Sequence, residues 1–283
     1  MKVLVIGGSG FLGSRVSDFL TTKGYKVTIF DKKKSLWINK NQKFIKGNIS
    51  DNKSLEKNIK GKDFVYNFAA ISDIEEANNH LIKTAYINIL CNLKILKICK
   101  TNKIKRFIFA STVYAHSKQG GFYRVSKQSA ELFTEEFCKK NNLNYTILRY
   151  GSIYGPRANK NNGINRIVFN AQNKGQLEYG GSSKAERKFI HIDDASSLSV
   201  DILNKKYANS NVLITGNKRY KLKNVLLIIK KKIKLKSKIK FRNLRNQAHY
   251  NITPYSYEPS KDKLIKKSKF IKLENYLGEI LKK

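Results

Sequence analysis

The stretch MKVLVIGGSGFLG, residues 1–13, determines the fold class of this chain of 283 residues. Its short apolar run from Lys2 to Ile6 predicts a β-strand, and residues Phe11 to Lys23 have the apolar spacing of a helix. A further run, Tyr25 to Phe30, predicts the next strand. Together the three elements form a βαβ unit, in which two parallel strands are joined by a helix.

The glycines of the first turn predict a dinucleotide site. Gly7, Gly10 and Gly13 lie between the expected strand and the expected helix. Glycines there permit a tight turn, the approach of a pyrophosphate to the backbone and close packing of the helix on the strand. The first N–H groups of the helix, around Phe11 and Leu12, then face the anion at the positive end of the helix dipole.

Asp31 ends the second strand, about twenty residues after the glycine turn. A carboxylate at this place accepts hydrogen bonds from the hydroxyls of the adenosine ribose and repels the 2′-phosphate of NADP. Three lysines follow, Lys32 to Lys34, and offset part of that repulsion. The sequence therefore favours NAD over NADP.

Strands and helices continue to alternate through the first half of the chain. This pattern predicts an α/β fold with a Rossmann-type, doubly wound parallel sheet. The expected elements after the first βαβ unit are strands 43–46, 63–67, 106–110 and 144–148 and helices 51–59, 81–100 and 121–140.

The rhythm changes after Tyr150, where glycines and the first proline interrupt residues 151–163. We expect an NAD-binding domain over residues 1–150 and a smaller C-terminal substrate-binding lobe over residues 151–283. The two parts are expected to be interleaved, because residues 194–203 have the pattern of a helix that returns to the main sheet.

Two further expectations concern residues beyond 150. The elements that return to the main sheet should lie around residues 190–215. Lysines alternate with apolar residues from Lys230 to Arg242, which predicts a strand with one wet, basic face.

Tyr123 and Lys127 lie one helical turn apart in FYRVSKQSAE, downstream of the strand RFIFAST. A phenol with a pKa of about 10 is a poor base at neutral pH, but a nearby ammonium and a positive nicotinamide ring favour the phenolate. Tyr123 can then exchange a proton with a substrate hydroxyl while the cofactor takes the hydride. Thr112 or Ser111, at the end of the strand, can hydrogen-bond to the same substrate oxygen.

In combination, these motifs resemble the extended short-chain dehydrogenase/reductases of the NAD-dependent epimerase/dehydratase family, which act on nucleoside-diphosphate sugars. The motifs that carry the resemblance follow one another in the expected order. They are IGGSGFLG, Asp31, GNISD at 47–51, NFAA at 67–70, Asn88, FAST, YRVSK, LRYGSIYGPR at 148–157 and RKFIHIDDA at 187–195.

The resemblance implies further residues for both ligands. For NAD, it implies contacts from Asn48 and Ile49 near the adenine, from Ala69 and Ala70 along the cofactor, from Asn88, and from Tyr150 near the nicotinamide. For the substrate, it implies that Arg187 grips the diphosphate, a task that suits the fork of a guanidinium. Ser152 stands where the family often has a substrate-holding Asn, and Arg242 and Arg245 are candidates for a second arginine.

The residues after Thr112 limit which reactions of the family we expect. In 4,6-dehydratases of the family an Asp-Glu pair follows this threonine, because elimination of water needs a further acid and base. Val113 and Tyr114 stand here instead. The leading hypothesis is therefore a nucleotide-sugar epimerase of the UDP-glucose 4-epimerase kind. An NAD-dependent sugar dehydrogenase or reductase is the alternative, and a non-catalytic NAD-binding or RNA-associated scaffold is the alternative from another class.

The amino-acid composition limits which binding partners and which cellular compartment we expect. The 57 basic and 20 acidic residues give a formal charge of +37, but the lysines are spread along the chain without a base-stacking aromatic motif. We therefore expect no specific nucleic-acid partner, no membrane, no metal site and a cytoplasmic location, with Cys91, Cys99 and Cys138 as buried free thiols. The family resemblance implies a homodimer formed through the helices 81–100 and 121–140.

Overall fold

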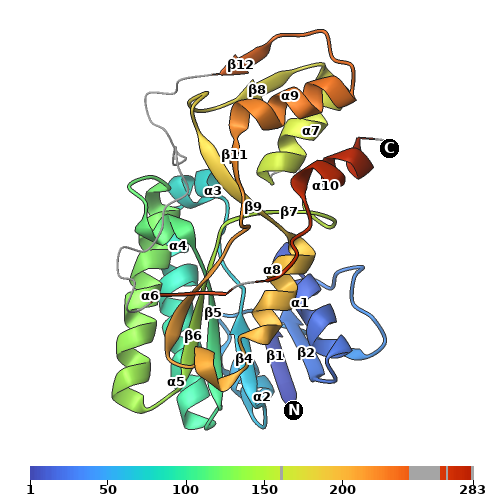
Figure 1. Ribbon diagram of the computed structural model, residues 1–283. Helices are drawn as coiled ribbons and strands as arrows, with labels where there is room; N and C mark the ends of the chain where they lie inside the picture. Colours follow the sequence, from blue (N-terminus) through green and yellow to red (C-terminus); the bar gives the residue numbers. More distant parts are fainter. Residues whose placement is uncertain (160–161, 242–261, 266, 282–283) are drawn as a thin grey trace.

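The computed structural model describes residues 1–159, 162–241, 262–265 and 267–281. Its centre is a sheet of eight strands in the order β13-β10-β6-β5-β4-β1-β2-β3, all paired in parallel (Figure 1). The strands are β1 Lys2–Ile6, β2 Lys26–Asp31, β3 Gln42–Lys46, β4 Phe64–Asn67, β5 Arg106–Thr112, β6 Tyr145–Tyr150, β10 Ser210–Ile214 and β13 Asp262–Leu264. The predicted Rossmann-type, doubly wound sheet is confirmed.

Alternate side chains of β1 fill two separate cores, one on each face of the sheet. Val3 and Val5 pack in the core with α1 and α8, whereas Leu4 and Ile6 pack in the core with α2, α5 and α6. This follows from the two-residue repeat of a strand. The helices are α1 Phe11–Thr22, α8 Ile192–Asp201, α2 Asn52–Ile59, α5 Cys91–Thr101 and α6 Gly121–Asn141.

The helical stretch expected over residues 81–100 contains a π-helical turn. It consists of α4 Leu81–Ala85, the π-helix Tyr86–Leu90 and α5. A short helix that the sequence did not predict, α3 Ile74–Asn79, precedes it and is capped by the Asp73 side chain. The cysteines Cys91, Cys99 and Cys138 are free and buried, as expected.

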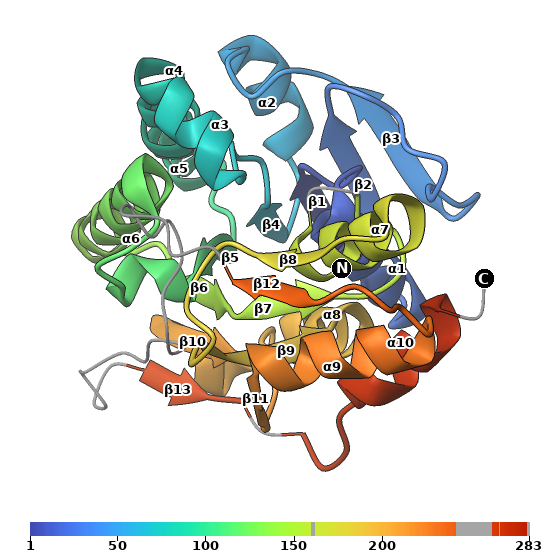
Figure 2. The ribbon, with the colours of Figure 1, turned by 90° about the horizontal axis from the view of Figure 1, so that it is seen from above.

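Most of the remaining elements form a smaller part with its own apolar core, above the carboxyl ends of the sheet strands (Figures 1 and 2). One small sheet has the strand order β11-β9-β7, and a second consists of β12 and β8. The elements are β7 Ser152–Tyr154, α7 Gly163–Lys174, β8 Leu177–Tyr179, β9 Glu186–His191, β11 Arg219–Lys221, α9 Leu222–Lys232, β12 Ile239–Phe241 and α10 Leu273–Ile280.

The predicted strand from Lys230 to Arg242 is wrong over its first part. Residues 230–232 are the last turn of α9, whose buried residues Val225, Leu226 and Ile229 have helical spacing. Only Ile239–Phe241 forms a strand. Arg242 and Arg245 lie outside the described residues.

None of the helices in the described ranges is both long enough and apolar enough to cross a membrane.

Candidate active site

A single cavity of about 690 Å³ runs along the carboxyl ends of the central strands. This edge, where the strand order reverses between β1 and β4, is the usual ligand site of an open α/β sheet. The cavity brings together fifteen of the residues expected from the sequence. They are Gly7, Gly10, Phe11, Leu12, Gly13, Asp31, Asn48, Ile49, Ala69, Ala70, Ser111, Thr112, Tyr123, Lys127 and Tyr150.

The glycine turn has the shape that a pyrophosphate requires. Gly7 has a φ of +76°, and a Cβ there would lie 2.6 Å from the Ala69 nitrogen. A Cβ at Gly13 would lie 2.4 Å from the Gly7 carbonyl oxygen, so the helix could not approach the strand with any larger residue. The start of α1 at Gly10 has no side-chain cap and no acidic residue in its first turn. Its unpaired N–H groups are thus available to an anion in the cavity.

Asp31 is held in place beside the glycine turn. Its Oδ2 accepts a hydrogen bond of 3.0 Å from the Ser9 N–H, and its Oδ1 accepts one of 3.3 Å from the Lys33 N–H. Lys32 lines the cavity beside it. The carboxylate is therefore fixed, and its remaining lone pairs are available to ribose hydroxyls.

Tyr123, Thr112 and Lys127 meet at the other end of the cavity. The hydroxyls of Tyr123 and Thr112 share a hydrogen bond; burial raises the pKa of Tyr123 to about 12, although this bond opposes the rise. The Lys127 Nζ donates a 2.8 Å hydrogen bond to the Ala110 carbonyl oxygen and lies 4.7 Å from the centre of the Phe109 ring. Burial lowers the pKa of Lys127 to about 8. An acid/base phenol and a titratable ammonium thus share one wall.

Ser111 lines the cavity but directs its hydroxyl elsewhere. It donates a hydrogen bond to the Glu131 carboxylate, which is buried in α6. Thr112 is consequently the strand-end hydroxyl that contacts Tyr123.

Asn88 does not line the cavity and instead supports its wall. Its Oδ1 accepts from the Ile71 N–H at 2.8 Å, and its Nδ2 donates to the Ile71 carbonyl oxygen at 3.0 Å and to the Ser126 Oγ at 2.9 Å. The π-helical turn places Ile87 in the cavity and directs Asn88 to Ile71. Tyr150 lines the cavity, and its hydroxyl lies 2.6 Å from the Ser199 Oγ.

The two expected substrate residues lie outside the cavity wall. Ser152 is in β7 and pairs with Phe189 of β9. Arg187 in β9 is buried, and its guanidinium donates to the Tyr179 hydroxyl at 2.8 Å and to the Glu186 carbonyl oxygen at 2.9 Å.

Several cavity residues were missed by sequence reasoning. Some stand within or directly after quoted motifs but were not named as site residues, such as Gly47 in GNISD and Lys32 after Asp31. Others belong to helices that the sequence did not predict or lie just before them, such as Glu76 and Asn162. The full set is Phe30, Lys32, Gly47, Phe68, Ile71, Ser72, Glu76, Lys83, Ile87, Ala110, Gly151, Ile153 and Asn162.

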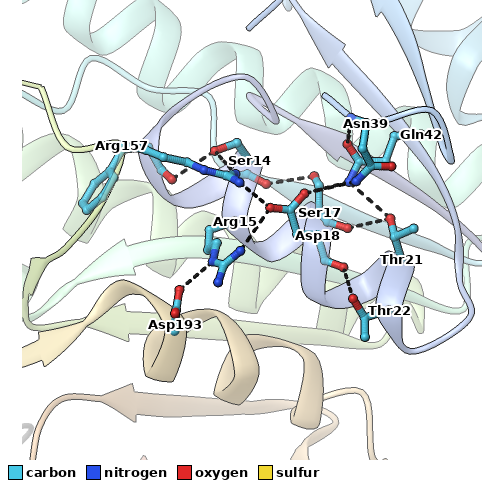
Figure 3. A network of polar contacts seen from close by, with 12 residues as sticks. Ser14, Arg15, Ser17, Asp18, Thr21, Thr22, Asn39, Gln42, Arg157 and Asp193 are labelled. Carbon is cyan, nitrogen blue, oxygen red and sulfur yellow. Dashed lines mark hydrogen bonds and ion pairs between the residues drawn. The ribbon is translucent and has the colours of Figure 1, made fainter. Parts of the chain in front are cut away.

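A polar network joins α1 to the loop that follows β7 (Figure 3). Asp18 accepts hydrogen bonds from Arg157 at 2.6 Å and from Gln42 at 3.1 Å, and Arg157 also donates to the Ser14 Oγ at 3.2 Å. The Arg157 guanidinium lies 5.2 Å from the centre of the Trp37 ring. The network thus holds Arg157, four residues after the cavity residue Ile153, against the helix that begins at the glycine turn.

Comparison with known proteins decides the family. Residues 3–214 match the model of the NAD-dependent epimerase/dehydratase family. The chain belongs to this family. It is therefore an enzyme with NAD as its cofactor, and the glycine turn and Asp31 fit that cofactor.

Individual relatives differ in the reaction named for them. This family member is 30% identical to a dTDP-D-glucose 4,6-dehydratase of Dictyostelium discoideum over 76% of the chain, but that match spans only 58% of the relative. It is 27% identical to an uncharacterized UDP-glucose epimerase of Bacillus subtilis, over 73% of the chain and 74% of the relative. Its fold matches the UDP-glucuronic acid 4-epimerase of Bacillus cereus with a TM-score of 0.85 at 24% identity, over 100% and 99% of the two chains.

Proposed function

We propose that the enzyme is a nucleotide-sugar 4-epimerase that keeps its NAD bound through the reaction. The observation that carries this proposal is the composition of the cavity. It joins the glycine turn and Asp31 to Thr112, Tyr123 and Lys127 in one cavity. Epimerisation is neutral in redox terms overall, so it requires no second substrate.

In the proposed reaction the Tyr123 phenolate accepts the proton of the sugar hydroxyl while Thr112 hydrogen-bonds to the same oxygen. Bound NAD supplies the acceptor for the hydride from that carbon and its later return to the opposite face of the sugar. Tyr123 then gives the proton back to the oxygen. The Lys127 ammonium favours the phenolate at each stage by its positive charge.

Dehydration is disfavoured as the reaction. Elimination of water needs a further acid and base beside the oxidised carbon. Neither of the two residues after Thr112 is a carboxylic acid: Val113 is buried in an apolar cluster, and the Tyr114 ring packs edge-on against Tyr123 at 6.2 Å. The chain therefore lacks the Asp-Glu pair that dehydratases of the family carry at this place.

Identification of the small molecules that leave the denatured protein tests this proposal. Release of NAD in near-stoichiometric amount supports an epimerase, since that reaction regenerates its cofactor in place. An empty protein that consumes added NAD together with a sugar substrate would instead establish a dehydrogenase.

We also propose Arg187 as a contact of the nucleotide diphosphate and Ser152 as a contact of the substrate. Support for Arg187 comes from its charge and its burial within β9. Its guanidinium would have to exchange the Tyr179 hydroxyl for the phosphate. Arg187→Lys should raise KM roughly tenfold with little change in kcat, because an ammonium cannot replace the guanidinium fork. An unchanged KM would remove Arg187 from the site.

A homodimer is proposed through the helices α4, α5 and α6. Large apolar side chains are exposed along α4, the π-helix Tyr86–Leu90 and α6, with helical spacing in Ile82, Tyr86 and Leu90 and in Phe122, Val125, Leu132 and Phe133. Such a face is buried in the usual symmetric dimer of soluble proteins. Light scattering should give twice the chain mass, and Phe133→Glu should return the protein to a monomer. A monomeric wild-type protein would contradict the proposal.

We further propose a cytoplasmic location, which the buried free thiols Cys91, Cys99 and Cys138 support, because thiols stay reduced there.

A further inference from the structure

A buried ion pair lies directly behind the strand end that carries Thr112. The Arg149 Nη2 is 2.7 Å from the Glu131 Oε2, and the Arg149 Nε lies 3.2 and 3.1 Å from the two carboxylate oxygens. The side chains of Glu131 and Arg149 are only 4% and 6% exposed. Burial of charged groups costs free energy, and even a paired buried charge contributes little to stability. The presence of this ion pair therefore indicates a role other than stabilising the fold.

Glu131 connects the elements that carry the catalytic groups. It belongs to α6, two turns after Tyr123 and one turn after Lys127, and all three side chains lie on the buried side of the helix. Its carboxylate accepts a hydrogen bond from Ser111, the residue before Thr112. The His116 Nε2, in the turn after Thr112, lies 3.7 Å from the Glu131 Oε2.

We propose that Glu131 is a positioning residue that fixes the end of β5 against α6 through Ser111 and Arg149 and places a negative charge one helical turn from Lys127. The inference rests on the proposed function, since it assigns Glu131 to the Tyr123 and Lys127 pair. Glu131 does not touch the substrate in this scheme and acts through Ser111 and Lys127.

The charges around Lys127 support this role. Burial is the main cause of its lowered pKa, and the negative charge of Glu131 is the opposing cause. Burial also opposes the ionisation of Glu131, but contacts with His116, Arg149 and Ser111 outweigh it and hold the pKa of that carboxyl below its ordinary value. Glu131 therefore remains charged over the whole range in which Lys127 titrates. Removal of Glu131 would take away the cause that opposes the effect of burial on the pKa of Lys127.

Glu131→Gln tests the proposal because it removes the charge and keeps an oxygen for Ser111. The matched control is Glu135→Gln, one turn further along α6, where the carboxylate accepts a 2.7 Å hydrogen bond from the Asn211 Nδ2. The direct readout is the pH at which Lys127 becomes reactive, since only a neutral amine is acetylated by acetic anhydride. Mass spectrometry of the Lys127 peptide gives this midpoint on the full chain without any substrate.

The expected midpoint is near pH 8 for the wild-type protein and for Glu135→Gln. In Glu131→Gln it should fall by about one pH unit, and the alkaline limb of kcat for the nucleotide sugar should fall with it while KM stays unchanged. A midpoint equal to that of the wild type would overturn the proposal, whatever the activity of the variant.

If Glu131→Gln does not fold because Arg149 loses the carboxylate of Glu131, the double variant Glu131→Gln/Arg149→Gln removes both charges. It should show the same fall of the Lys127 midpoint, and an unchanged midpoint would again overturn the proposal. A wild-type protein that converts no nucleotide sugar would refute the proposed function, and the Lys127 midpoints would still decide the role of Glu131.

Discussion

The Lys127 ammonium donates a 2.8 Å hydrogen bond to the carbonyl oxygen of Ala110, in the strand that ends at Thr112. The strand and the helix that carry the reacting groups are thereby joined within the site itself. Because Thr112 in turn shares a hydrogen bond with Tyr123, the phenol and the ammonium are held at fixed places along one wall of the cavity.

Tyr123→Phe should lower kcat by a factor of roughly a hundred or more, since it removes the group that exchanges the proton. NAD content and thermal stability should stay near the wild-type values, because the phenyl ring fills the same space. Tyr25→Phe, at the amino edge of the sheet where Tyr25 packs on Phe64, makes the same chemical change far from the cavity and serves as the control. Equal turnover of Tyr123→Phe and wild type would remove Tyr123 from the mechanism.

The pH dependence of kcat should have an alkaline limb at or below pH 8. Burial lowers the pKa of Lys127 from its ordinary value to about 8, so the ammonium is present below that pH and is lost above it. Turnover should decline as the pH rises through this value, because the neutral amine no longer favours the Tyr123 phenolate. Circular dichroism over the same range separates this effect from unfolding. A kcat that keeps rising well above pH 8 would show that the charge of Lys127 is not needed.

Asp31→Asn should change the choice of cofactor. An asparagine keeps an oxygen for the Ser9 N–H but removes the charge that repels a 2′-phosphate, and Lys32 is beside it in the cavity. We expect weaker binding of NAD and stronger binding of NADP, with a ratio that shifts by roughly tenfold or more. Calorimetric titration of the cofactor-free protein with each dinucleotide measures it. The same preference in both proteins would mean that Asp31 does not face the ribose.

Asp18→Asn should destabilise the protein, although Asp18 does not line the cavity. The Asp18 and Arg157 side chains are each only 16% exposed, and the substitution leaves Arg157 without its anion. We expect a loss of about 2 kcal/mol in the free energy of unfolding and a fall in Tm of about 5 °C. Glu56→Gln, on the exposed side of α2, is the control. If Asp18→Asn and Glu56→Gln have the same Tm, the Asp18 carboxylate in the network of Figure 3 contributes nothing to stability.

The sequence was sufficient for the first six strands of the main sheet, β1 to β6, because their signals are local. Val3 to Ile6 are buried, and the glycines after them are required by close contacts with the Ala69 backbone and within the turn itself. Tyr123 and Lys127 are one turn apart on a single helix, so their common place on the cavity wall also follows from spacing. The strands β10 and β13 were not predicted as such.

Contacts between residues far apart in the chain could not be predicted from the sequence. Nothing in the local pattern shows that Glu131 is buried, because a carboxylate in a lysine-rich helix usually faces water. Its burial depends on Arg149, which comes from β6, and on Ser111, which comes from β5. The π-helical turn that directs Asn88 to Ile71 is likewise invisible in the apolar spacing of residues 81–100.

The most direct test of the central claim is proton NMR of a nucleotide sugar incubated in D₂O with the purified enzyme and no added cofactor. UDP-glucose is the first substrate to use, followed by other UDP-sugars. The C4 epimer should appear, no solvent deuterium should enter at C4 because the hydride is held within the site, and Tyr123→Phe should stop the conversion. Deuterium at C4, or loss of the C6 hydroxyl in place of inversion, would contradict it.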